Sequence, residues 1–154
     1  MKKALLLIIL FQFIVIFSQS KISKRELEII FRKSISQTKK SKMHIGENSW
    51  KICIDKDSNE INLYETKFEN YSDCCRYNNW TFYKKNKFIK NESYICSEPL
   101  LSIVTTGDDW YEVDYIDDEN LILIIKSKKK TENFIVKEIQ KRKDNLHIIK
   151  LIKI

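Results

Sequence analysis

Hydrophobic and polar residues alternate with a period of two along most of the chain from Trp50 onward. A strand with one buried face shows this alternation, because successive side chains point to opposite faces. The clearest alternating positions are Trp50, Ile52 and Ile54, then Trp80 and Phe82, then Tyr111, Val113 and Tyr115. The pattern predicts about eight or nine short strands, within 50–54, 61–68, 80–82, 88–89, 101–106, 111–115, 121–125, 134–139 and 146–152.

Short polar segments separate these strands, as KKNK does at 84–87 and DDEN at 117–120. Because the chain has only two Gly, we expect Asn86, Asn120 and Asn145 to take the positive φ angles that tight turns need. Regularly spaced short strands are typical of a sandwich or a barrel. Short connections favour an all-β, up-and-down antiparallel barrel, since closing the sheet removes its exposed edges.

The segment 22–35 has a helical pattern instead. Ser23 and Glu26 form a capping box, and Leu27, Ile30, Phe31 and Ile35 recur at helical spacing. Residues 36–49 are polar and basic. We therefore expect a short helix and linker over 21–47, before a barrel domain over 48–154.

The first twenty residues have the pattern of a cleavable signal peptide. Two lysines precede an apolar run over 4–17, and the small polar segment Ser-Gln-Ser follows at 18–20. The run of about 14 residues is shorter than the ~20 that a membrane span needs. The alternative is an uncleaved N-terminal anchor. Cleavage would give an exported protein, periplasmic or secreted, without a stable membrane span.

All four cysteines (Cys53, Cys74, Cys75 and Cys96) follow the expected signal segment. An even number of cysteines in an exported domain indicates disulfides, and four allow three pairings. Adjacent Cys74 and Cys75 point to opposite sides of an extended chain, which favours distant partners for each. A zinc site is the alternative, but there is no CxxC spacing and the only histidines are His44 and His147. We expect no metal.

The charge is basic and unevenly distributed. Removing 1–20 takes away two lysines, so the net charge changes from +7 to +7 − 2 = +5. The segment 91–125 holds nine acidic residues and no Lys or Arg, whereas 126–154 holds ten basic residues and three acidic ones. We expect the two blocks to pair across the sheet; a cation site in the acidic block is the alternative. An exported protein rarely meets nucleic acid, so we expect no nucleic-acid partner. The remaining candidate for a basic exported chain is an anionic partner of the cell envelope.

Several short motifs resemble one known family. A Trp strand begins at SWKI (49–52), CCRYNNWTF (74–82) places cysteines before an aromatic strand, and Cys96 follows the next hairpin. WYEV (110–113), DDENLIL (117–123) and FIVK (134–137) complete the series. Over about 47–140 the chain resembles the bacterial lipocalin-like domain family, small exported calycin-type barrels. Asn48 stands where lipocalins have a Gly, two residues before the Trp.

The resemblance implies a barrel in which Cys74 or Cys75 bonds Cys96. Cys75–Cys96 is the favoured pair, with Cys53–Cys74 as the second. It also implies binding of a small hydrophobic ligand or lipid. The inward positions that could line such a pocket are Trp50, Ile52, Trp80, Phe82, Tyr111, Val113 and Tyr115.

Two functions follow from these observations. A hollow barrel would bind a small apolar ligand, whereas a filled barrel would be an interaction or structural module of the cell envelope. Trp110 has the opposite parity to Tyr111, so one of the two faces outward or marks a bend.

No GxSxG, HExxH or phosphate-binding loop is present. We therefore expect no enzymatic activity, no catalytic residues and no cofactor.

Overall fold

The computed structural model describes residues 22–35, 48–54, 58–66, 74–94, 96, 101–102 and 110–154. The expected signal segment 1–20 lies outside these residues, as do most of the linker, His44 and the part of the expected strand at 103–106.

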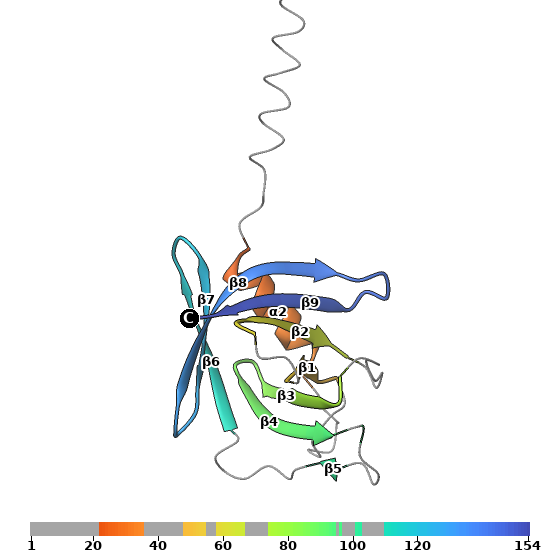
Figure 1. Cartoon of the computed structure of the whole chain (residues 1–154). Coiled ribbons are helices and arrows are strands. Elements are labelled where there is room, and N and C mark those ends of the chain that lie inside the picture. The colour runs from red at the N-terminus through yellow and green to blue at the C-terminus, as the bar shows by residue number, and fades with distance from the viewer. Residues whose placement is uncertain are drawn as a thin grey trace, which may run out of the picture.

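Eight antiparallel strands form a closed barrel (Figure 1). Around the barrel their order is β2, β1, β3, β4, β6, β7, β8 and β9, and β9 pairs with β2 to close it. A two-residue strand, β5 (Leu101–Ser102), extends the sheet beside the far end of β4. The barrel strands are β1 (Trp50–Cys53), β2 (Glu60–Glu65), β3 (Arg76–Lys84), β4 (Lys87–Tyr94), β6 (Trp110–Asp117), β7 (Leu121–Lys126), β8 (Thr131–Lys141) and β9 (His147–Lys153).

The prediction of a simple up-and-down order is wrong at one place. β1 lies between β2 and β3, so these two strands follow each other in the chain but are not neighbours in the barrel. The other edge of β2 is occupied by β9, which pairs with it over five residue positions. β3 therefore joins the free edge of β1, with Trp50 opposite Trp80 and Cys53 opposite Tyr77.

Two disulfides fasten this region. Cys53 bonds Cys74, which joins the end of β1 to the start of β3, and Cys75 bonds Cys96 beyond the end of β4. This is the pairing that we favoured between the two that the family resemblance allowed. Disulfides persist in oxidising compartments, so they indicate an extracellular type of environment.

The helix α2 (Lys24–Lys33) lies across the barrel end that carries the β3–β4 turn. Ser23 caps it as predicted, with its Oγ accepting a 3.2 Å hydrogen bond from the Glu26 amide. Glu28 forms a 2.9 Å ion pair with Lys85 of that turn. The buried face of the helix (Leu27, Ile30 and Phe31) belongs to the same hydrophobic core as the strands.

The strand predictions are confirmed in the described residues, although β3, β4 and β8 extend further than the sequence pattern indicated. Asn145 has the predicted positive φ, at 64°. Asn86 and Asn120 do not; within the described part, the other non-Gly residue with positive φ is Asn48, at 51°. The backbone at Asn48 thus takes the conformation that Gly adopts most easily.

Candidate functional site

The seven residues predicted to line an interior pocket all lie on inward strand positions. Six of them (Trp50, Ile52, Trp80, Phe82, Tyr111 and Val113) are buried in the core, and Tyr115 is partly buried against it. Their rings pack face to face and edge to face. Phe31 of α2 stacks on Phe82 with ring centroids 4.7 Å apart, and its ring lies 5.2 Å from that of Trp50. At the helix end, therefore, side chains of α2 occupy space among the residues predicted to contact an apolar ligand.

Tyr115 completes the contact between barrel and helix. The Lys24 ammonium lies 5.5 Å from the centre of its ring. Burial raises the pKa of the Tyr115 hydroxyl, and the carboxylates of Glu28 and Asp114 add to the rise. The neutral phenol is thereby favoured, and the contact is structural.

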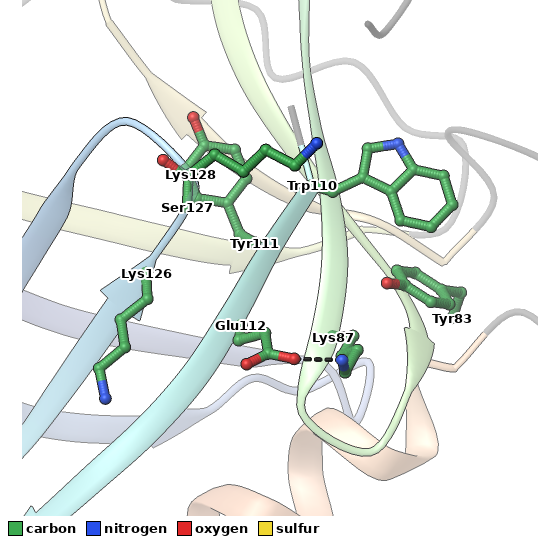
Figure 2. A pocket seen from close by; sticks show the side chains of 8 residues that line it. All are labelled: Tyr83, Lys87, Trp110, Tyr111, Glu112, Lys126, Ser127 and Lys128. Atoms are coloured by element: carbon green, nitrogen blue, oxygen red, sulfur yellow. Dashed lines mark ion pairs between the residues drawn. The ribbon is translucent and has the colours of Figure 1, made fainter. Parts of the chain in front are cut away.

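A pocket of about 350 Å³ lies on the outside of the barrel (Figure 2). It is formed where the end of β3, the start of β4, the start of β6 and the end of β7 meet, together with the loop after β7. We call it the outer groove. Its lining residues are Tyr83, Lys87, Trp110, Tyr111, Glu112, Lys126, Ser127 and Lys128.

Two aromatic side chains form one side of the outer groove. Trp110 is 50% exposed, and its ring meets that of Tyr83 edge to face at 5.2 Å (Figure 2). Strand alternation explains the exposure, because Tyr111 points inward and stacks on Phe88 while its neighbour points outward. The prediction that Trp110 or Tyr111 faces out is confirmed, and Trp110 is the one.

The rest of the outer groove is cationic. Lys87 forms an ion pair with Glu112, whose hydrogen bond and negative charge raise the pKa of the lysine (Figure 2). Lys126 pairs with Asp114 at 3.1 Å, which joins the acidic and basic blocks across the sheet as expected. Lys128 has no ion pair within the described residues. The lining therefore holds three ammonium groups and one carboxylate.

Burial raises the pKa of the Tyr83 hydroxyl. The positive charge of the nearby Lys87 ammonium partly offsets this rise. The groove can thus offer the phenol ring of Tyr83, the indole of Trp110 and lysine ammonium groups. Such a set suits an anionic partner that also carries an apolar group.

Most of this site was not predictable from the sequence. Trp110 stood out by parity and Lys126 and Lys128 lie in the basic block, but nothing local connects them with Tyr83 and Lys87. Only the β4–β6 pairing, with Lys87 opposite Glu112, brings the two halves together.

The described residues hold no group of three or more His, Cys, Asp or Glu side chains that could bind a metal. His147 instead pairs with Glu65, its Nδ1 2.6 Å from the carboxylate oxygen. In the part of the chain that the structure describes, no helix is long and apolar enough to cross a membrane.

Comparison of the chain with protein-family models, with curated proteins and with solved structures gives no match.

Proposed function

We propose that this chain is an exported binding module that captures an acidic protein segment in the outer groove. The observation that carries the proposal is the half-exposed Trp110, which lies against Tyr83 and beside three lysines. Exposed Trp and Tyr residues supply much of the binding energy in protein interfaces. Lysines around them attract acidic partners and orient them.

The packing of the interior supports a site on the outside. Leu27 and Phe31 of α2 are completely buried among the inward strand residues. An apolar ligand at that end of the barrel would have to displace the helix, at the cost of its burial. We therefore favour the interaction-module alternative, with the helix end of the barrel filled, over a hydrophobic ligand. We propose a likeness to lipocalin-like domains in architecture alone. The position of β1 between β2 and β3 departs from a simple meander.

Two observations support export. The two disulfides suit an oxidising compartment, and the sequence at 1–20 has the pattern of a signal peptide. An acidic partner in the cell envelope or outside the cell would be accessible to such a protein.

The test uses a blocked acidic peptide with a central aromatic residue, EEFEE, titrated calorimetrically at low and high salt. One variant carries Lys87→Gln, Lys126→Gln and Lys128→Gln. Its control carries Lys137→Gln, Lys141→Gln and Lys143→Gln, three exposed lysines outside the groove. Both lose the same charge.

We expect binding to weaken with salt and the groove variant to bind about tenfold or more weakly, while the control stays near the wild type. Equal losses in both variants would show attraction by net charge alone and contradict the proposal. So would binding to anionic phospholipid vesicles in preference to the peptide.

A further inference from the structure

The inner face of the barrel becomes polar away from the helix. Beyond the stacked pair of Phe82 and Phe88, the next inward pair along β3 and β4 is Trp80 and Lys90, which lie directly opposite each other. The pair after that is Asn78 and Glu92. Tyr111 borders both this region and the outer groove, but Trp80 and Lys90 do not line the groove, and the inference drawn from them does not depend on the proposed function.

Among the described residues, the indole N–H of Trp80 has no acceptor. The residue is 3% exposed, and its Nε1 is buried without a hydrogen-bond partner. The other core tryptophan, Trp50, donates from its Nε1 to Ser34 at 2.8 Å. A buried donor without an acceptor is costly, so a ligand that supplies an acceptor there gains affinity. The Oδ1 of Asn78, on the same face, is also buried without a partner in the part of the chain that the structure describes.

Lys90, directly opposite Trp80, brings a second donor to the same face. It is half-buried, and its ammonium lies 5.7 Å from the centre of the Tyr111 ring. Within the described residues it has no ion pair, and the nearby Glu132 binds Lys130 at 3.2 Å and Lys153 at 3.3 Å.

The electrostatics agree with this geometry. Burial lowers the pKa of Lys90, and the positive charges of Lys130 and Lys153 lower it further, against Glu132 and Glu92. An anion at the ammonium would offset both effects.

We propose that Trp80 and Lys90 form an inner site for a small carboxylate. One carboxylate oxygen accepts from the indole Nε1–H and the other from the Lys90 ammonium. The flat carboxylate fits beside the aromatic rings of Phe88 and Tyr111, which are stacked at 5.3 Å, and its small size suits a barrel whose helix end is packed. A rounder, more strongly hydrated phosphate should bind less well.

The test follows the indole ¹H–¹⁵N resonances of the full chain during titration with acetate, at constant ionic strength set by chloride. Trp50, bonded to Ser34, and exposed Trp110 are internal references. We expect acetate to shift the Trp80 resonance to a saturating value. Phosphate should produce a much smaller shift. Lys90→Gln should weaken acetate binding about tenfold, and Lys90→Arg should restore most of it.

The proposal would be overturned if acetate left the Trp80 resonance unchanged and that resonance showed magnetisation transfer from a bound water. The water would then be the acceptor of the indole N–H. Equal shifts with acetate, phosphate and chloride, or the same affinity in Lys90→Gln, would also overturn it. The Trp50 resonance reports whether each variant is folded. If a Lys90 variant loses the Trp50 resonance, Trp80→Phe replaces it in the test. Acetate should raise the Tm of the wild type and should not raise the Tm of Trp80→Phe.

Discussion

The indole Nε1 of Trp50 in β1 donates a 2.8 Å hydrogen bond to the Oγ of Ser34, the residue that ends α2. The Ser34 hydroxyl in turn donates to the Phe31 carbonyl at 2.8 Å. Both residues are buried. A helix that precedes the barrel strands in the chain is thus hydrogen-bonded to the barrel core, and the Trp50 indole depends on Ser34 for its acceptor.

Ser34→Ala should lower the free energy of unfolding by about 1–3 kcal/mol, because it leaves the buried Trp50 indole without an acceptor. Denaturant unfolding measures the loss. In a Trp50→Phe background the same substitution should cost clearly less, since no indole is then left unpaired. Equal costs in both backgrounds would show that the bond does not join helix and barrel.

Phe31→Ala should cost about 3–5 kcal/mol, since it removes a buried ring that contacts Phe82 and Trp50. The matched control is Ile29→Ala on the same helix, where the side chain is 42% exposed and the cost should be small. If Phe31→Ala unfolds like its control, α2 is not part of the core.

The two disulfides should contribute similarly to stability. Each joins cysteines 21 residues apart, and loops of that length give about 3 kcal/mol per bond in the chain-entropy account. The comparison is between Cys53→Ser with Cys74→Ser and Cys75→Ser with Cys96→Ser, by thermal unfolding. Free thiols detected in the unreduced wild type would contradict this pairing.

Burial of Lys90 should make stability depend on pH. Its pKa in the folded state is below the ordinary value of 10.5, so on raising the pH the folded protein loses this proton before the unfolded chain does. The unfolded chain then binds more protons, and stability rises with pH between the folded pKa and 10.5. Lys51, whose pKa burial also lowers, adds to the same trend.

Lys90→Met should therefore raise stability in carboxylate-free buffer near neutral pH and reduce the rise toward alkaline pH. Denaturant unfolding should be measured below pH 10, which is the ordinary pKa of tyrosine. Above that pH the unfolded chain loses the Tyr83 and Tyr115 protons before the folded protein does, and this difference lowers stability. The control is Lys137→Met at an exposed position. An unchanged pH profile in Lys90→Met would show that Lys90 is not the group responsible.

Local patterns predicted the parts of the fold that local physics determines. Ser23 was predictable as a cap, and the inward or outward direction of Tyr111 and Trp110 followed from strand alternation. The position of β1 between β2 and β3 was not predictable, because alternation fixes which face a residue points to and leaves open which edges pair. Docking of Phe31 into the barrel is a tertiary contact of the same kind.

The candidate site was predictable only in fragments for the same reason. Tyr83 and Trp110 are brought together by the pairing of β4 with β6, which no short motif encodes. The inner pair of Trp80 and Lys90 depends on the register of one hairpin. A shift of one residue in that hairpin would turn one partner outward.

The most direct test of the account is the affinity of Trp110→Ala for the acidic aromatic peptide, measured by calorimetry at fixed salt. The matched control is Ile116→Ala, on the same strand and 48% exposed. The account predicts binding about tenfold or more weaker for Trp110→Ala, with unchanged Tm, and wild-type affinity for the control. Wild-type affinity in Trp110→Ala would contradict it.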